Sequence, residues 1–344
     1  MRIALDATYS VGRNLSGVGV YSREILRGLA EAHPEAELLF CYRPHRLLRS
    51  FAERLPRNCR RRLLHEPLAP RSADLFHGLN QRLPRARLPR TVTTFHDLFV
   101  LSGDYSSPEF RRRFEEQARD AAKRSDLVLA VSEFTARQVE ELLGVERARL
   151  RVIPHGVRLP GGRESGERRE RIVLHVGAVQ KRKNISRLVA AFAALAPDWR
   201  LVLVGSLGYG AEEILHDIEQ SPRRESIQVL GYVSDEGLAR WYERAAIFAF
   251  PSLDEGFGMP VLEAMAWGVP VLTSNRSALP EVGGNAAVLV DPTDVDAIAG
   301  ALKELAENDE LRKKLAERGK TRAAAFPWET AVSKTWAAYC GLLR

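Results

Sequence analysis

Apolar runs of strand length alternate along this chain with longer stretches in which apolar residues recur at helical spacing. The first half holds such runs at residues 3–5, 38–40, 75–76, 91–95, 127–131 and 151–153. The second half holds them at residues 172–176, 201–204, 227–230, 247–250, 269–273 and 287–290. Strands that alternate with helices are typical of parallel sheets covered on both faces, so we predict an α/β fold with two sheets.

A segment rich in glycine and charge separates the two sets of runs. Residues 159–170 read LPGGRESGERRE, a composition typical of a linker between domains. We therefore predict a Rossmann-like N-terminal domain over residues 1–160 and a Rossmann-like C-terminal domain over residues 171–326. The last stretch, 327–344, has its large apolar residues at helical spacing and is predicted to be a helix.

Composition agrees with a globular protein of two domains. The chain has 344 residues, of which 45% are hydrophobic and 28% charged. Cys41, Cys59 and Cys340 form no C-x-x-C pair, so we expect no disulfide framework and no zinc site, and a reducing cytoplasm is the predicted compartment. Asp6 interrupts the apolar N-terminus and no apolar run approaches ~18 residues, so we expect neither a signal peptide nor a membrane span.

Positive charge is concentrated in the first half. Residues 1–160 carry 28 Lys and Arg against 19 Asp and Glu, whereas the remainder carries 23 against 25. The densest part lies within residues 43–71, where the segment 43–55 permits an amphipathic helix on an anionic membrane surface. A solvated basic face is the alternative. A nucleic-acid site is disfavoured because no aromatic residues are interleaved for base stacking.

Residues 251–271, PSLDEGFGMPVLEAMAWGVPV, predict a glycine turn that runs directly into a helix. Pro260 suits the start of a helix because its missing N–H would be unpaired there in any residue. The free N–H groups and the positive dipole end of such a helix favour an anion. Glu255 would lie in the loop beside that anion, and Glu263, further along the helix, would point toward a second polar part of the same ligand. A nucleotide sugar has both parts.

The spacing of these two carboxylates, E-G-F-G-x-P-x-x-E, resembles the Glu-x7-Glu signature of the retaining GT-B glycosyltransferases grouped as family four. The resemblance runs along the whole chain, with its specific motifs between residues 172 and 292. It implies two Rossmann-like domains that face each other across a cleft, with the acceptor over the first domain, the nucleotide sugar in the second, and the terminal helix crossing back onto the first. It also implies a catalytic Glu255 and a donor site that contains Gly256, Phe257, Gly258, Met259 and Glu263.

A second match lies at residues 174–192, which resemble the family's strand, glycine turn and Arg-Lys-Asn that opens a helix. The resemblance implies that Arg182 and Lys183 are catalytic cations that face the diphosphate, where negative charge develops on the leaving group. A solvent-exposed basic turn is the alternative. Some members carry an arginine directly after the strand glycine, where this chain has Ala178, so that phosphate contact is not expected.

The remaining donor contacts are assigned to the ends of two other strands. Gly205 ends the run at 201–204, and residues 231–252 also resemble the family. Open parallel sheets bind ligands at the carboxyl ends of their strands, so backbone groups of Tyr232 and Val233 are expected to hold the base.

The first half contributes three further candidates. Gly17 and Gly19 stand behind the first strand and in front of a helix, where a glycine turn lets a phosphate or sugar approach the backbone; a plain tight turn is the alternative. His96 follows the run at 91–95, and the resemblance of Phe95-His96-Asp97 to the family implies that it donates a hydrogen bond to the donor sugar. Without that resemblance, a lone histidine is more often structural.

The resemblance is closest to bacterial mannosyltransferases that act on polysaccharide or lipid-linked sugars, so retaining transfer of mannose from GDP-mannose is the first expectation. No Asp-x-Asp stands in a suitable place, so no cofactor and no metal are expected. The alternatives are a UDP-sugar-dependent transferase and a non-catalytic scaffold that binds nucleotide sugars or membranes. A hydrolase is disfavoured because it needs two carboxylates across a bond and no cationic site. The predicted location is the cytoplasm, with peripheral contact at the inner face of the membrane.

Overall fold

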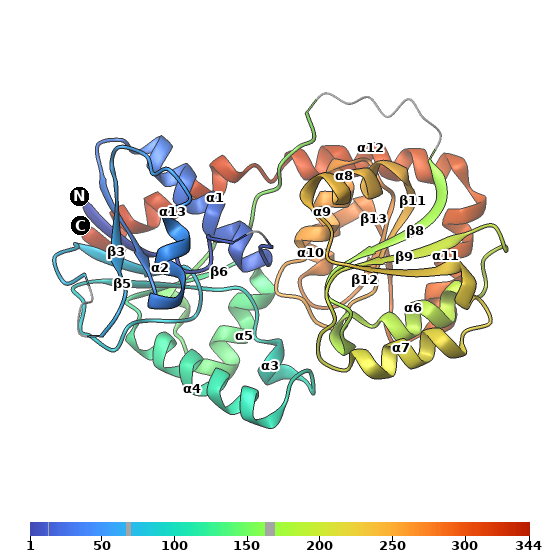
Figure 1. Ribbon diagram of the computed structural model, residues 1–344, viewed down its shortest axis with the longest axis horizontal. Helices are drawn as coiled ribbons and strands as arrows, with labels where there is room; N and C mark the ends of the chain where they lie inside the picture. The colour runs from blue at the N-terminus through green and yellow to red at the C-terminus, as the bar shows by residue number, and fades with distance from the viewer. Residues whose placement is uncertain (13, 67–69, 162–168) are drawn as a thin grey trace. The chain divides into compact units, whose positions relative to one another are not determined.

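The structure is a computed structural model that describes residues 1–12, 14–66, 70–161 and 169–344 (Figure 1). The chain divides into two compact units. Unit 1 comprises residues 1–102, 107–156 and 327–344, and unit 2 comprises residues 103–106 and 157–326. Much of the predicted linker, 162–168, lies outside the described residues, and its last residue, Glu170, already belongs to a strand.

Unit 1 is built on a parallel sheet of seven strands in the order β3-β2-β1-β4-β5-β6-β7. The strands are β1 (Arg2–Asp6), β2 (Glu37–Tyr42), β3 (Cys59–Leu63), β4 (Leu75–Gly78), β5 (Thr91–Phe95), β6 (Leu127–Ala130) and β7 (Leu150–Val152). In register, Ile3 of β1 pairs with Leu38 of β2 on one side and with Leu75 of β4 on the other.

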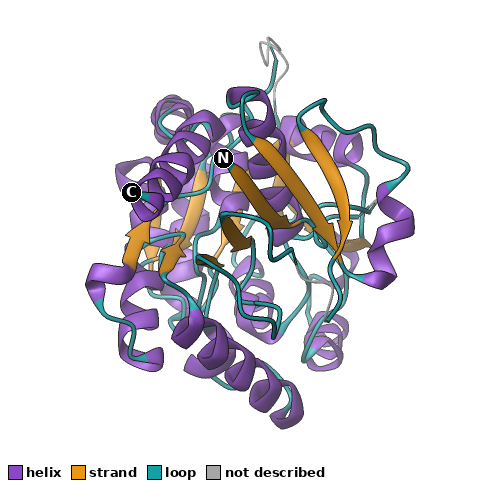
Figure 2. Cartoon of the chain, turned by 90° about the vertical axis from the view of Figure 1, so that its left-hand side faces the viewer, coloured by secondary structure: helices purple, strands orange, loops and turns teal. Residues whose placement is uncertain are grey.

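Helices flank the strands of unit 1 on both faces (Figure 2). They are α1 (Gly17–Ala32), α2 (Pro44–Ser50), α3 (Phe99–Ser102), α4 (Pro108–Arg124), α5 (Glu133–Leu143), the 3-10 turn η1 (Arg147–Arg149) and α13 (Trp328–Leu343). Serine side chains cap several of these helices, as where Ser132 accepts a hydrogen bond from the Thr135 N–H at the start of α5.

The C-terminal helix α13 is part of the core of unit 1. It packs on α1 so closely that a Cβ on Gly28 would lie 2.4 Å from Cγ2 of Val332. The ring of Trp336 stacks on His33 with centroids 3.7 Å apart. Tyr339 is fully buried, and its hydroxyl lies 2.5 Å from Nδ1 of His77 on β4.

Unit 2 is built on a parallel sheet of six strands in the order β10-β9-β8-β11-β12-β13. The strands are β8 (Glu170–Val176), β9 (Arg200–Val204), β10 (Ile227–Gly231), β11 (Ala245–Phe250), β12 (Val271–Ser274) and β13 (Ala287–Val290). The helices and 3-10 turns are η2 (Lys181–Lys183), α6 (Ile185–Phe192), α7 (Ala211–Gln220), η3 (Arg224–Ser226), α8 (Asp235–Arg244), α9 (Met259–Ala266), α10 (Leu279–Gly283), η4 (Gly284–Ala286), α11 (Val295–Glu307) and α12 (Asp309–Ala324). The prediction of two Rossmann-like α/β sheets is confirmed.

Each sheet reverses its order of strand addition at one point. In unit 1 the chain passes from β1 outward to β2 and β3, and then returns to place β4 on the other side of β1. In unit 2 the corresponding reversal lies between β8 and β11. The loops that follow two such strands separate and leave a crevice at the carboxyl edge, which is where open α/β sheets bind ligands.

The basic segment 43–55 forms a shorter helix than the sequence pattern permitted, because α2 ends at Ser50. The guanidinium of Arg61 donates two hydrogen bonds to the carbonyl of Ser50, at 3.2 Å from Nε and 2.9 Å from Nη2, and so satisfies an oxygen that a longer helix would have used. Leu48 and Phe51 are nevertheless exposed, at 83% and 64%. In the described part of the chain, none of the helices combines the length and the apolar character needed to cross a membrane.

Candidate functional site

The loops that follow β8 and β11 border the crevice at the strand reversal of unit 2. A Cβ on Gly205, at the end of β9, would lie 2.0 Å from the carbonyl oxygen of Gly177, so the loops after β8 and β9 approach too closely for any side chain there. The loop after β8 turns through η2 and enters α6 at Asn184, which has a φ of 60°. The side chain of Asn184 donates to the carbonyl of Pro251 at 3.0 Å and therefore joins this loop to the one after β11.

Arg182, Lys183 and Glu255 meet in this crevice and are all buried. One carboxylate holds both cations: Nη1 of Arg182 lies 2.9 Å from Oε2 of Glu255, and Nζ of Lys183 lies 2.5 Å from Oε1. Arg182 also donates to the carbonyl of Asp254, and Nζ of Lys183 lies 4.5 Å from the centre of the Phe250 ring. The alternative of a solvent-exposed basic turn is therefore wrong.

The electrostatics of this trio follow from its burial. Burial by itself raises the pKa of Glu255, but the charges and hydrogen bonds of Arg182 and Lys183 outweigh burial and lower the pKa to about 2. Glu255 is therefore ionised throughout the neutral range. The trio carries one net positive charge, held in fixed positions in a region that excludes water, which is an arrangement suited to an anionic ligand.

Glu263 has a different environment from Glu255. It lies on α9, whose start is shaped by Gly258 at a φ of 102°; a Cβ there would also lie 2.7 Å from Cδ2 of Leu279. Helix α9 begins at Met259, so Pro260 occupies its second position. The hydroxyl of Tyr242 donates to Oε2 of Glu263 at 3.0 Å. Burial raises the pKa of Glu263, and the Tyr242 hydrogen bond offsets only part of that rise.

The other residues predicted for the donor site are spread along the same edge of the sheet in unit 2. Gly256 and Phe257 follow Glu255 directly and are buried, whereas Tyr232, just beyond β10, is 45% exposed. Val233 follows Tyr232 in the turn that leads to Ser234, the cap of α8. The structure therefore brings the two cations and Glu255 into contact. It places Tyr232 and Val233 directly after β10, which is the outermost strand on one side of the sheet.

Gly17, Gly19 and His96 lie in unit 1. Gly17 opens α1, and a Cβ on Gly19 would lie 2.9 Å from the carbonyl oxygen of Tyr9, which explains the glycine by a close backbone approach. His96 is buried, and because a carbonyl can only accept, its Nε2–H donates to Leu79 at 2.9 Å. The predicted hydrogen bond from His96 to the donor sugar would need this N–H, which already donates to a carbonyl within unit 1.

A group of aromatic and histidine side chains surrounds His96. Its Nδ1 lies 3.4 Å from Nε2 of His155, and its ring meets Tyr21 edge to face at 4.7 Å between centroids. Burial lowers the pKa of His96 to about 4, so the imidazole is neutral near pH 7. A neutral, hydrogen-bonded histidine can hold its neighbouring groups in position but does not supply a charge.

Sequence reasoning missed two residues that shape the crevice in unit 2. Tyr242, on α8, orients Glu263, and its only sequence signal is a tyrosine on the inner face of an amphipathic helix. His175, inside β8, donates from Nδ1 to the carbonyl of Ala249 at 2.9 Å and stacks on Phe250 beneath Lys183. Burial lowers its pKa to about 4. A histidine within the otherwise apolar run at 172–176 is the signal that could have drawn attention to it.

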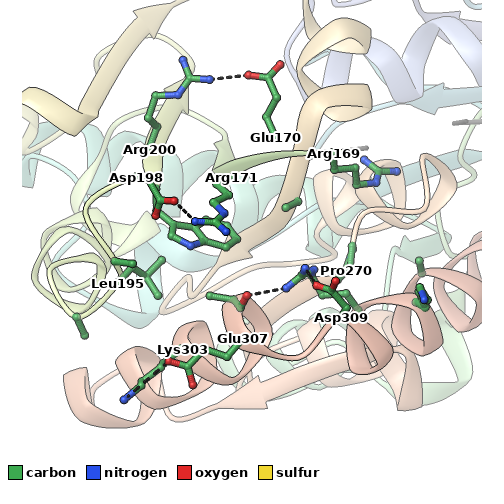
Figure 3. A pocket seen from close by; sticks show the side chains of 18 of the residues that line it. Arg169, Glu170, Arg171, Leu195, Asp198, Arg200, Pro270, Lys303, Glu307 and Asp309 are labelled. Atoms are coloured by element: carbon green, nitrogen blue, oxygen red, sulfur yellow. Dashed lines mark hydrogen bonds and ion pairs between the residues drawn. The ribbon is translucent and has the colours of Figure 1, made fainter. Parts of the chain in front are cut away.

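A cavity of about 1080 Å³ in unit 2 lies away from this crevice (Figure 3). Its walls include Glu170, Arg200 and Pro270, which stand at the amino ends of β8, β9 and β12. Several of its charged side chains pair with each other, as Arg171 does with Asp198 and Arg200 with Glu170. The cavity is thus at the edge of the sheet opposite to the one where α/β sheets bind their ligands.

Comparison with known proteins identifies the family of this chain. Residues 163–322 match the family described as "Glycosyl transferases group 1", and residues 15–159 match "Glycosyltransferase Family 4". The O-antigen chain mannosyltransferase B of Escherichia coli is 32% identical over 97% of this chain and 98% of its own length. The chain belongs to the group 1, or family 4, glycosyltransferases. The MMP alpha-(1->4)-mannosyltransferase of Mycolicibacterium hassiacum is 33% identical over 66% of this glycosyltransferase and 56% of its own length.

Solved structures show the same fold. Sucrose-phosphate synthase from Thermosynechococcus elongatus superposes on the glycosyltransferase with a TM-score of 0.80 at 23% identity, covering 99% of each chain. The Anabaena protein HepE, in complex with UDP and glucose, superposes with a TM-score of 0.75 at 18% identity, again covering 99% of each chain. The predicted GT-B fold is confirmed, as is the assignment to glycosyltransferases.

Proposed function

We propose that this glycosyltransferase moves mannose from GDP-mannose, with retention of the anomeric configuration, to a glycan or lipid-linked acceptor. The observation that carries the proposal is the buried pair of cations that one carboxylate fixes at the strand reversal of unit 2. A nucleotide sugar brings two negative phosphates to such a crevice, and its sugar and ribose bring hydroxyls. The choice of mannose is supported by the names of relatives such as the O-antigen chain mannosyltransferase B.

In the proposed reaction, the bond between the anomeric carbon and the diphosphate oxygen breaks, and Arg182 and Lys183 stabilise the charge that develops on the diphosphate. The acceptor hydroxyl attacks from the face that the diphosphate leaves, and its proton passes to a departing phosphate oxygen. Glu255 holds the two cations, and Glu263, oriented by Tyr242, accepts hydrogen bonds from hydroxyls remote from the reacting bond.

A UDP-sugar donor is the second candidate, because HepE was solved with UDP and glucose. The predicted base contacts are backbone groups of Tyr232 and Val233, which do not by themselves select a guanine or a uracil. A non-catalytic scaffold is the third candidate, and it would bind donor without transfer to any acceptor.

Thermal shift with GDP and UDP, followed by transfer assays with GDP-mannose and UDP-glucose, tests the proposal. A nucleotide at a concentration of 100 Kd should stabilise the protein by about 2.7 kcal/mol, and we expect that stabilisation with GDP. We also expect an α-linked product from the α-linked donor when the anomeric proton is observed by NMR. Stabilisation by UDP alone would favour the second candidate, and an inverted product would overturn the retaining mechanism. Transfer that persists in EDTA is expected, since we propose no metal cofactor.

We also propose a peripheral contact between unit 1 and an anionic membrane, which would suit a lipid-linked acceptor. Leu48 and Phe51 form an exposed apolar patch around the end of α2, and Arg49, Arg54 and Arg57 surround it in sequence and are themselves exposed. Basic residues near an anionic bilayer contribute about 1 kcal/mol each, and exposed apolar side chains add to this by insertion.

Flotation with liposomes measures this contact. We expect recovery with anionic vesicles at low salt, and loss at high salt because the Debye length falls. Replacing Arg49, Arg54 and Arg57 together by glutamate should lower partitioning about tenfold or more, and Leu48→Ser with Phe51→Ser should also lower it at low salt. Leu159→Ser removes another exposed leucine and serves as the control. Equal recovery with neutral and anionic vesicles would identify the basic segment as a solvated face.

A further inference from the structure

His175 is a polar residue in the interior of unit 2, with a side chain that is fully buried within β8. Its Nδ1 lies 2.9 Å from the carbonyl oxygen of Ala249. Because a carbonyl can only accept, Nδ1 carries the proton of the neutral ring and Nε2 carries the lone pair. Among the described residues, this Nε2 has no hydrogen-bond partner. A buried acceptor without a donor is costly, so a role for this atom is expected.

Gly177 locates Nε2 beside the side chain of Lys183. A Cβ on Gly177 would lie 3.6 Å from Nε2 of His175 and 3.3 Å from Cε of Lys183. Gly177 also has a φ of 153°, a conformation that residues with a side chain rarely adopt. The glycine therefore leaves open a small gap that both the lone pair of His175 and the end of the lysine side chain border.

Phe250 is a second neighbour that His175 and Lys183 share. The imidazole stacks on the Phe250 ring with centroids 5.4 Å apart, and Nζ of Lys183 lies 4.5 Å from the centre of the same ring. Burial is the main reason that the pKa of His175 is lowered to about 4, and the positive charge of Lys183 adds to this decrease. The imidazole is therefore neutral near pH 7 and can accept a hydrogen bond without adding charge.

A neutral acceptor suits this place because of the charge that Lys183 must keep. An ammonium has three N–H donors on a flexible stem, and Oε1 of Glu255 accepts from Nζ of Lys183 at 2.5 Å. A diphosphate that enters the crevice competes with this carboxylate for the ammonium. A second carboxylate beside Lys183 would cancel the charge that attracts the anion, whereas an imidazole lone pair leaves it intact.

We propose that His175 is a positioning residue for Lys183: when a diphosphate is bound, Nε2 of His175 accepts a hydrogen bond from the ammonium and keeps it directed at the leaving group. Nζ is bonded to Cε, which already borders the gap beside Gly177, so rotation about the terminal bonds of the lysine changes its distance from Nε2. The inference rests on the proposed function for the diphosphate.

Two substitutions separate the two nitrogens of His175. Asparagine carries an amide N–H near the place of Nδ1 and has nothing at the place of Nε2, whereas the longer glutamine brings an amide oxygen to the place of Nε2. With the nucleotide sugar that the transfer assays identify, His175→Asn should lower kcat about tenfold and change the donor KM by less than about threefold. His175→Gln should restore most of the lost kcat.

Coupling to Lys183 gives two further readouts. In a double variant with Lys183→Ala, His175→Asn should have no further effect on kcat, because His175 acts only through the ammonium. Nitrogen-15 NMR of histidine-labelled protein observes Nε2 directly, and the resonance of His175 is the one missing in His175→Gln. Addition of GDP should shift this resonance in the wild type and not in Lys183→Ala. This comparison decides the question even where His175→Asn does not fold.

Thr273→Val is the matched control for the loss of the Ala249 hydrogen bond in His175→Gln. Thr273, on the other neighbour of β11, also donates a buried side-chain hydrogen bond to that strand, at 2.8 Å to the carbonyl of Phe250. Thr273→Val should lower Tm by a few degrees and leave kcat unchanged.

A wild-type kcat in His175→Asn would overturn the proposal, as would an equal loss of kcat from His175→Asn with lysine or with alanine at position 183. A resonance of His175 that shifts equally in the wild type and in Lys183→Ala would also overturn it. A shift with UDP in place of GDP would support the role of His175 and count only against GDP-mannose as the donor.

Discussion

Lys183→Ala is expected to lower kcat about 100-fold, and by more than it raises the KM for the nucleotide sugar. The Lys183 ammonium is buried between the Phe250 ring and Glu255, so its attraction for a phosphate is screened little by water. That attraction strengthens as charge develops on the leaving diphosphate, which is why kcat should carry the larger effect. Steady-state kinetics with GDP-mannose measures both constants.

Lys181→Ala is the control for this experiment, because Lys181 lies in the same 3-10 turn but its side chain is 47% exposed. The fold should survive Lys183→Ala, since Arg182 remains 2.9 Å from Glu255 and keeps that carboxylate paired. Circular dichroism and thermal unfolding check this point. Unchanged turnover in both Lys183→Ala and Arg182→Ala would mean that the diphosphate does not bind beside these cations.

Glu255→Gln should lower kcat by about 100-fold or more, whereas Glu263→Gln should mainly weaken nucleotide binding. Glutamine at 255 can no longer hold both cations by charge, so their geometry relaxes while the positive potential in the crevice rises. The Kd of GDP should therefore be maintained or lowered in Glu255→Gln. Glutamine at 263 keeps an oxygen for Tyr242 but loses a charge-assisted acceptor, so the Kd of GDP should rise about tenfold.

Calorimetric titration of both variants with GDP, beside steady-state kinetics, separates these effects. The pH dependence of unfolding gives a second readout for Glu255. Because its pKa is lowered from 4.5 to about 2, the trio stabilises the fold fully above pH 4.5, and this contribution is lost as the pH falls toward 2. The acid loss of stability should be shallower in Glu255→Gln. Equal losses of kcat and of GDP affinity in the two variants would contradict the separate roles.

Periodicity predicted every strand of the described residues except β3, because buried parallel strands appear in the sequence as continuous apolar runs, whereas the edge strand β3 reads CRRRL. The runs at 91–95 and 201–204 correspond to β5 and to most of β9, and the glycine turn at 256–258 does precede a helix. Strands and glycine turns of this kind depend on residues that are close together in the sequence, so the sequence predicts them. The end of α2 was not predicted because it depends on Arg61, which lies on β3, outside the helix, and donates to the carbonyl of Ser50.

Sequence motifs singled out residues of the candidate site, but not the contacts that these residues make in the structure. Arg182 and Glu255 were both found from motifs, but their ion pair spans two loops that only the strand order brings together. Each was therefore assigned to the ligand, whereas the structure pairs them with each other. Tyr242, the partner of Glu263, lies on a different helix, and the Nε2–H of His96 donates a hydrogen bond to a backbone carbonyl. Neither contact can be predicted from a sequence pattern.

Because α13 belongs to unit 1, that unit can complete its fold only after the C-terminal helix has been synthesised. Residues 157–326 contain nearly all of unit 2 in one continuous segment, so the folding of that unit does not depend on α13. Unit 1 begins the chain but must wait for Tyr339 to reach His77 and for Val332 to cover Gly28. The unit whose strands are synthesised first therefore cannot complete its fold until all of unit 2 has been synthesised.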